Sequence, residues 1–421
     1  MFTRRSRLKS AINHKITDRI PIDMGGTPQT SISITAYKKL IDTLGFNKKY
    51  PKLYDFAAQF ALPEIEVMDY FQTDVIEMAH GFLNSINDWK EFIIPHNGIK
   101  CLIPRYLDNL YYIKIILEDD GTILVKHKDG TTLGKMPKSS VYIDPIFFPY
   151  SDLEKLPKYF DKVALNKYLW SLPAVGSHLN LLNDRQYRIF TNSIKKLFEN
   201  QDRAIVYFFG GSLFSLGVEL RKNVNFYCDV FTNKKGVKRI VNKLVDDYLK
   251  ILEKVIMDIG DYIEAVHFLD DFAFQDGLII PPELYREIFK PGHKKMWEFI
   301  HNNSNCKILF HSCGSIFKLI PDLIDAGIDI LTPIQTSAKD MEPKKLKREF
   351  GKDLVFWGGG CDTDILAFGT IKEVEEDVKK KIDILGKNGG FVFAPILLIT
   401  AEVPPENIIA MYDTAYKFGF Y

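Results

Sequence analysis

The chain has 421 residues, 46% of them hydrophobic, and a formal net charge of +1 at pH 7. It has no long Lys/Arg tract, which excludes nucleic acid as the expected partner, because phosphate binding needs a concentrated basic face. No apolar run reaches the roughly 18 residues of a membrane span, the N-terminus lacks a signal-peptide core, and five cysteines predict no disulfide framework, so we expect a cytoplasmic protein with reduced thiols.

The first part of the chain predicts two strands and then a region of different character. Strands are expected at 19–24 and 73–78, each followed by a turn or helix. Between residues 81 and 150, aromatic and β-branched residues alternate with turns such as Asp119-Asp120-Gly121, which are hairpin signals. We therefore expect residues 81–200 to form an inserted antiparallel β and helical region between the second and third strands. Helical spacing is found at 3–14, 34–44, 55–69 and 151–200.

From residue 204 onward, strands alternate regularly with helices. The six expected strands are 204–209, 265–271, 307–311, 328–331, 354–357 and 391–395. Such alternation produces right-handed βαβ units and a parallel sheet. With the two earlier strands the total is eight, which predicts an α/β fold of the (β/α)8 TIM-barrel type, with residues 1–421 as one domain. An open doubly wound sheet is the alternative, although no G-x-G-x-x-G follows the first strand.

Polar or glycine-rich groups follow nearly every expected strand. In a barrel, active-site groups cluster at the carboxyl ends of the strands, and so many polar ends favour an enzyme. These groups are Asp23, Glu77, Gly210-Gly211-Ser212, Asp270-Asp271, His311 with Cys313, Gln335, and Cys361-Asp362.

His311 and Cys313 form the strongest candidate for a metal site. Strand alternation places both side chains on one face, and zinc binds imidazole nitrogen and thiolate sulfur readily. Cys361 follows another short strand and is the expected third ligand, because the ends of two parallel strands can converge on one ion. The alternative is a buried histidine with two buried free cysteines.

Two further groups are candidates for ligand contacts. Asp270 or Asp271 could act as a catalytic carboxylate, and Gln335 is a third candidate catalytic residue; the alternative for the two acids is capping or turn formation. Adjacent strand residues point in opposite directions, so at most one of the two acids should face the axis. The Gly210-Gly211-Ser212 segment could present backbone N–H groups to a cofactor anion, or it could be a plain tight turn.

Several segments together resemble the uroporphyrinogen decarboxylase superfamily. The resemblance covers nearly the whole chain and is most specific in its second half. It implies a (β/α)8 barrel and one of two chemistries: metal-free decarboxylation of uroporphyrinogen III, or zinc-dependent methyl exchange with corrinoid proteins. The segments that carry it include Asp18-Arg19-Ile20-Pro21, His311-Ser312-Cys313-Gly314, Trp357-Gly358-Gly359-Gly360-Cys361-Asp362-Thr363 and Val403-Pro404-Pro405-Glu406-Asn407-Ile408.

The resemblance favours the methyltransferase branch. The decarboxylase branch carries an Arg-Gln-Ala-Gly-Arg signature after its first strand, whereas this chain reads Met24-Gly25-Gly26-Thr27-Pro28-Gln29-Thr30 without arginine. The His-x-Cys and later Cys of the other branch carry over to His311, Cys313 and Cys361 as zinc ligands. By this resemblance, Cys361→Ser abolishes both zinc binding and methyl transfer.

The implied reaction exchanges a methyl group between a small methylated substrate or a thiol and a corrinoid (cobalamin) carried on a separate protein. Other readings are a decarboxylase, a zinc-dependent lyase or hydrolase, and a non-catalytic ligand-binding barrel. The sequence specifies neither methyl donor nor acceptor, nor whether the chain forms a homodimer.

Overall fold

The computed structural model describes residues 2–46, 50–168, 170 and 183–421. Its centre is a parallel sheet in the order β18-β17-β16-β15-β12-β11-β4. Ile22 closes this sheet, because it pairs in parallel with Phe393 just after β18 and its carbonyl accepts the amide of Asp74 just before β4, at 2.7 Å. The predicted (β/α)8 TIM barrel is confirmed. The strands are β4 (Val75–Glu77), β11 (Ala204–Gly210), β12 (Ala265–Leu269), β15 (Lys307–His311), β16 (Ile330–Thr332), β17 (Val355–Trp357) and β18 (Phe391–Val392).

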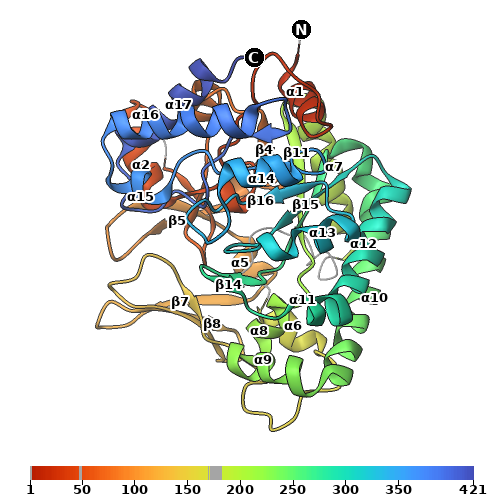
Figure 1. Ribbon diagram of the computed structural model, residues 1–421. Coiled ribbons are helices and arrows are strands. Elements are labelled where there is room, and N and C mark those ends of the chain that lie inside the picture. Colours follow the sequence, from red (N-terminus) through yellow and green to blue (C-terminus); the bar gives the residue numbers. More distant parts are fainter. Residues whose placement is uncertain (1, 47–49, 169, 171–182) are drawn as a thin grey trace.

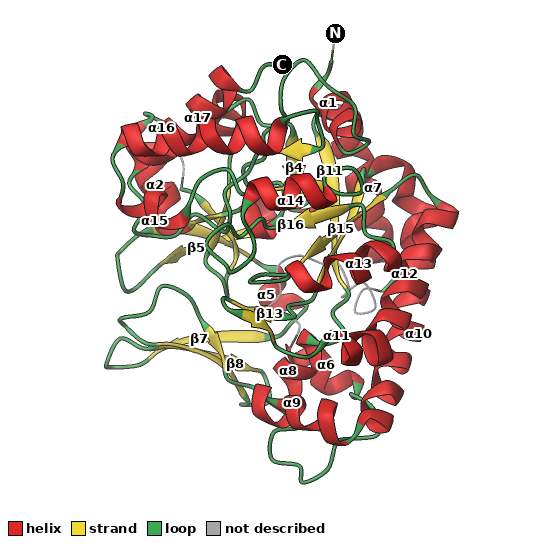
Figure 2. Ribbon diagram, viewed as in Figure 1, coloured by secondary structure: helices red, strands yellow, loops and turns green. Residues whose placement is uncertain are grey.

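Helices surround the barrel, and α10 and α12 pack side by side on one flank (Figures 1 and 2). Among the described residues, no helix is long and apolar enough to cross a membrane. The main helices are α1 (Arg4–Ala11), α2 (Ile34–Thr43), α7 (Asp184–Asn200), α10 (Lys234–Ile259), α12 (Lys290–Asn303), α13 (Ile320–Ala326), α14 (Pro343–Phe350), α16 (Ile371–Lys381) and α17 (Pro405–Phe418).

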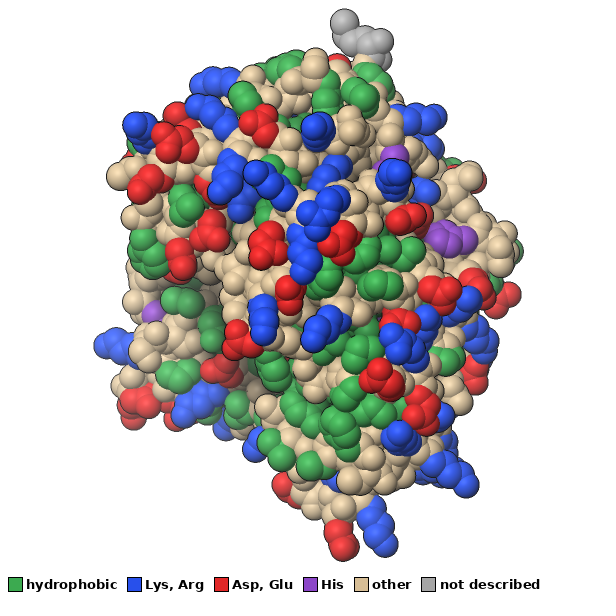
Figure 3. Space-filling view, viewed as in Figure 1, with side chains coloured by type: hydrophobic (Ala, Val, Ile, Leu, Met, Phe, Trp, Pro, Cys, Tyr) green, Lys and Arg blue, Asp and Glu red, His purple; other side chains and the backbone are tan. Residues whose placement is uncertain are grey.

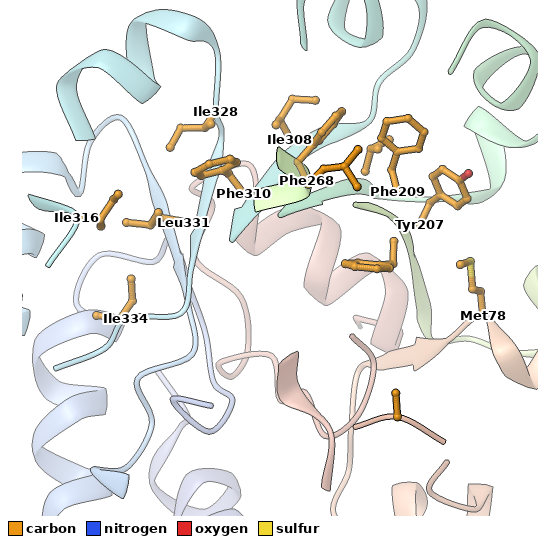
Figure 4. Close-up of a cluster of buried hydrophobic side chains, with 14 of the residues drawn as sticks. Met78, Tyr207, Phe209, Phe268, Ile308, Phe310, Ile316, Ile328, Leu331 and Ile334 are labelled. Atoms are coloured by element: carbon orange, nitrogen blue, oxygen red, sulfur yellow. The ribbon is translucent and has the colours of Figure 1, made fainter. Parts of the chain in front are cut away.

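Alternation along the strands divides the core into two layers. Outward side chains such as Tyr207, Phe268 and Phe310 are buried between the strands and the helices (Figure 4). Inward side chains such as Leu309 pack in the barrel together with Leu8 of α1, so α1 closes the amino end of the barrel. Beyond these layers, the inner face continues into polar residues towards the carboxyl ends of the strands, where the site lies.

A buried ion-pair network holds the first strand at that amino end. Asp74 accepts hydrogen bonds from Arg7 at 2.7 Å and from Arg19 at 2.6 Å, and it also accepts the amide of Ile22 at 2.8 Å. Because the carboxylate has several partners, its burial is compensated. At the surface, basic and acidic side chains are intermixed on the visible face (Figure 3), in keeping with the absence of a long Lys/Arg tract from the sequence.

Two further sheets flank the barrel: one is antiparallel throughout, and the other is mixed because its strands β2 and β6 pair in parallel. The expected hairpins form, but one sheet also draws strands from before β4. The prediction of a helix over 55–69 is wrong in its first half, because residues 60–62 pair with β2 and β1 and this pairing overrides local preference. The boundaries 81–200 stay a prediction, and residues 171–182 lie outside the described residues. One sheet contains β1 (Ile32–Ser33), β2 (Lys52–Asp55), β3 (Phe60–Leu62), β5 (Trp89–Ile93) and β6 (Lys100–Pro104); the other contains β7 (Ile113–Leu117), β8 (Ile123–His127), β9 (Thr132–Met136) and β10 (Asp144–Pro145).

Candidate metal centre and the adjoining cavity

Three side chains with metal-binding atoms meet at the carboxyl ends of β12 and β15. Nε2 of His311 lies 3.2 Å from Sγ of Cys313 and 3.8 Å from Oδ1 of Asp271. One ligand atom from each residue lies within 4.8 Å of the other two. Bonds of about 2.0–2.3 Å to zinc place neighbouring ligand atoms roughly 3–4 Å apart. The spacing of these three groups therefore fits one zinc ion with a place left for a further ligand.

The local backbone explains why these groups meet. His311 ends β15 and Cys313 continues its alternation, while Gly314 then turns with a φ of 82°. A side chain at Gly314 would lie 2.5 Å from the carbonyl oxygen of Phe274, so only glycine fits the turn. Oδ1 of Asp271 accepts the amide of Cys313 at 2.7 Å, which holds the two strand ends together.

Burial sets the protonation states of this group in the absence of a cation. It lowers the pKa of His311, so the imidazole is neutral and keeps a lone pair for a metal. Burial, and to a smaller degree the nearby Asp271 charge, raise the pKa of the Cys313 thiol. A bound divalent cation would reverse this effect, because a thiol that coordinates a metal loses its proton. The donor set therefore has the chemistry of a zinc site.

Three ring nitrogens of two buried histidines in the barrel lack hydrogen-bond partners among the described residues. Nδ1 of His311 and both nitrogens of His267 have none within the described part of the chain. The ring centroids of the two histidines lie 6.3 Å apart. Ring nitrogens buried in this way normally bond to water or to a ligand. His267, which lies inside the apolar strand β12, is thus beside the candidate metal centre.

Cys361 does not join His311 and Cys313. Its sulfur is buried beside Asp377 of α16, and burial together with this carboxylate raises the pKa of the thiol. The chain turns before it reaches Cys361, because Gly358 and Gly359 have φ values of 92° and 80°. Asp271 is the third group that the structure brings to this place, whereas Cys361 as a zinc ligand stays a prediction.

Asp270 and Asp271 point in opposite directions, as expected for adjacent strand residues. Asp270 is 1% exposed, and its carboxylate accepts the amides of Leu213, Phe214 and Ser215 at 2.6–3.1 Å. Oδ2 of Asp270 also lies 3.3 Å from Nε2 of His293. Asp270 thus holds the turn between β11 and α8 (Ser215–Arg221), whereas Asp271 belongs to the candidate metal centre.

Gln335 supports the loop that carries Cys313. Its Oε1 accepts the amide of Gly314 at 2.7 Å, and its Nε2 donates to Oε1 of Gln275 at 2.8 Å. The structure does not place Gln335 among the three metal-binding groups. Gln335, predicted as a catalytic residue, thus lies where it can orient the turn after Cys313.

A cavity of about 370 Å³ adjoins the candidate metal centre. Asp271 and Cys313 form part of its wall, as does the Gly210-Gly211-Ser212 segment that was predicted to bind a cofactor. The amides that follow this segment already donate to Asp270. Glu219 of α8 also lines the cavity, and sequence reasoning missed it, because no local pattern distinguishes it from a surface acid of a short helix.

Two more acids that follow predicted strands are buried elsewhere in the barrel. Oδ2 of Asp23 accepts the indole N–H of Trp357 at 2.9 Å, and burial raises the pKa of Asp23 to about 6. Burial raises the pKa of Glu77 to about 8, and neither of its carboxylate oxygens has a hydrogen-bond partner in the described residues. Both acids are therefore held closer to neutrality than ordinary carboxylates.

The family profile of uroporphyrinogen decarboxylase (URO-D) matches residues 174–418, which is more than half of the chain. The protein belongs to the URO-D family. No curated relative matches the sequence.

One solved structure supports the barrel fold. A methyltransferase from Methanosarcina mazei is 15% identical, with a TM-score of 0.53 over 99% of each chain, and at this identity the likeness is one of fold. A GH10 endoxylanase retrieved from a sugarcane soil metagenome is 11% identical, with a TM-score of 0.36 over 57% of this chain and 85% of the other. Nothing is inferred from that second likeness.

Proposed function

We propose that this protein is a zinc-dependent methyltransferase that exchanges a methyl group between a small methylated molecule or thiol and a corrinoid carried on a separate protein. The observation that carries the proposal is the convergence of His311, Cys313 and Asp271 at the carboxyl end of a URO-D family barrel. The Methanosarcina mazei protein of similar fold is a methyltransferase, which agrees with this choice of chemistry.

The zinc ion would be held by Nε2 of His311, Sγ of Cys313 and a carboxylate oxygen of Asp271. When bound there, zinc supplies a Lewis acid that favours the thiolate form of a thiol or activates a methylated donor. Asp271 has a second role, because it holds the Cys313 amide and so fixes the direction of the sulfur. The adjoining cavity gives a small substrate access to these groups.

The metal-free decarboxylase is the weaker reading. Uroporphyrinogen carries several carboxylates, and proteins bind such groups with arginine or lysine. Residues 24–30 contain no arginine or lysine, and neither do the described residues that line the cavity beside Cys313. A cytoplasmic location, a corrinoid protein partner and a homodimer remain parts of the proposal.

The first experiment measures metal content and methyl transfer together. Protein purified without a nickel-binding tag should contain about one zinc per chain by elemental analysis. With a thiol acceptor, it should demethylate methylcobalamin, used here as the probe for the corrinoid, in an absorbance assay. A chelator should remove both signals, and added zinc should restore both. Well-folded protein without zinc, or turnover of uroporphyrinogen that is indifferent to chelator, would contradict the proposal.

A further inference from the structure

The cavity beside the candidate metal centre has a lining that selects for charge. Its volume of about 370 Å³ suits a small molecule. Two carboxylates, Asp271 and Glu219, line it, whereas Lys, Arg and His are absent from the described lining residues. Six aromatic side chains form much of the remaining wall: Tyr168, Phe208, Phe214, Tyr227, Tyr248 and Phe274.

Glu219 is the acid without a structural role in this wall. No hydrogen bond or ion pair joins its carboxylate to another residue in the described ranges, whereas Asp271 is engaged with the Cys313 amide. Burial and the nearby Asp271 charge raise the pKa of Glu219. A carboxylate desolvated in this way is costly unless a positive charge lies beside it. Among the described residues that line this cavity, none supplies such a charge.

The aromatic rings line the same cavity as this acid. Burial, and to a smaller degree the charge of Glu219, raise the pKa values of Tyr168 and Tyr227, and all three residues line the cavity. Phe214 stacks on Tyr227 with ring centroids 5.8 Å apart and an angle of 4° between the ring planes. Tyr248 is fixed by a hydrogen bond from its hydroxyl to the carbonyl of Ser212 at 3.2 Å. Ring faces attract organic cations, most strongly where water is excluded.

We propose that the cavity binds the ammonium group of a small cationic substrate, with Glu219 as the counter-charge and the rings of Tyr168 and Tyr227 around it. The same molecule then extends towards Cys313 and Asp271, where its thiol or methyl-bearing end reacts. This inference rests on the proposed function and adds the substrate class. It excludes sulfonates, phosphates and carboxylates as the group held in the cavity, because two acids already line it.

The test is calorimetric binding of three probes with matched shapes. Choline is the cation, 3,3-dimethylbutan-1-ol is its neutral counterpart, and 3,3-dimethylbutanoate is the anion. Choline should bind at least about 10-fold more tightly than either of the others, as expected for a desolvated cation among aromatic rings. Equal affinity for the neutral alcohol, tighter binding of the anion, or no binding of choline would overturn the inference.

Two variants locate the binding. Glu219→Gln removes the charge at constant size. It should lower the affinity for choline about 10-fold without changing the weak binding of the alcohol. Glu283→Gln, a change to a carboxylate that is 74% exposed, is the matched control and should bind choline as the parent protein does. An unchanged choline affinity in Glu219→Gln would overturn the assignment of this acid.

Zinc content, measured on the same preparations, separates the two proposals. It should stay constant in Glu219→Gln, which also shows that the variant is folded. Zinc and methylcobalamin demethylation without choline binding would overturn only the substrate class. Choline binding without zinc would overturn only the zinc-dependent methyltransferase.

Discussion

The carboxyl ends of β15 and β17 each carry a cysteine next to glycine, but they place the two cysteines in different surroundings. At β15 the glycine turn comes after Cys313, so strand alternation carries its sulfur to His311. At β17 the glycine turn comes before Cys361, and the sulfur is buried beside Asp377 of α16. The comparison teaches that the order of cysteine and turn decides whether a thiol faces the barrel or its helices.

The sharpest test of this comparison replaces each cysteine in turn by serine. Cys313→Ser should lose zinc almost completely, by at least about 100-fold in affinity, because a serine hydroxyl is a poor replacement for a zinc-binding thiolate. Cys361→Ser is the matched variant and should keep its zinc, in contrast to the expectation from family resemblance. Elemental analysis measures both. Loss of zinc in Cys361→Ser would show that this loop rearranges to supply a ligand.

Glu77 extends the comparison to a buried acid outside the metal centre. Its folded pKa of about 8 lies above the ordinary value of 4.5. The protonated carboxyl of Glu77 therefore adds to the free energy of unfolding below pH 4.5, and this contribution is lost as the pH rises through 8. Each unit of pKa shift corresponds to about 1.4 kcal/mol. Glu77→Gln does not titrate, so its melting temperature should rise relative to the parent between pH 4.5 and pH 8. A difference that is constant with pH would contradict this assignment.

Substitutions of the neighbouring acids should affect different properties: stability at Asp270 and metal binding at Asp271. Asp270→Asn replaces one carboxylate oxygen by an NH2 group. This group cannot accept hydrogen bonds from the backbone N–H groups of Leu213, Phe214 and Ser215. We expect a loss of about 2–3 kcal/mol in the free energy of unfolding, measured by urea denaturation of metal-free protein. Asp271→Asn is the control and should lose less than about 1 kcal/mol, because its side chain is 42% exposed. Equal losses would mean that the two acids have equivalent roles.

Asp271→Asn should instead weaken the binding of zinc. The amide oxygen can still approach the ion, but it lacks the charge of a carboxylate, so we expect a loss of about 10–100-fold in zinc affinity. Competition with a chromophoric chelator measures this affinity. Asp270→Asn, where it remains folded, is the comparison variant and should change zinc affinity far less. Unaltered zinc affinity in Asp271→Asn would remove this residue from the ligand set.

Gln335→Leu should have the smallest effect. It removes the acceptor for the Gly314 amide but none of the three metal-binding groups. Zinc content should be retained, and methyl transfer should fall by less than about 10-fold, because the turn after Cys313 is held less firmly. Steady-state kinetics with methylcobalamin measures the change. A loss as large as that in Cys313→Ser would show that Gln335 contacts the reacting groups.

Local patterns were sufficient for most of the barrel. Apolar runs and helical spacing located its strands, and the glycine turn after Cys313 was visible in the chain. The region 55–69 was not predicted correctly, because its three-residue strand depends on pairing with β1 and β2. Such pairing joins residues far apart in sequence and leaves little local signal.

The sequence by itself determined the barrel and the pairing of His311 with Cys313, because strand alternation acts over two residues and needs no distant partner. Only the tertiary structure decided that Asp271 joins them, that Cys361 does not, and that Glu219 lines the same cavity. These outcomes depend on where the turns after different strands direct the chain and on which helices pack against them. Contacts of that kind are set by the closure of the whole barrel, so no single segment encodes them.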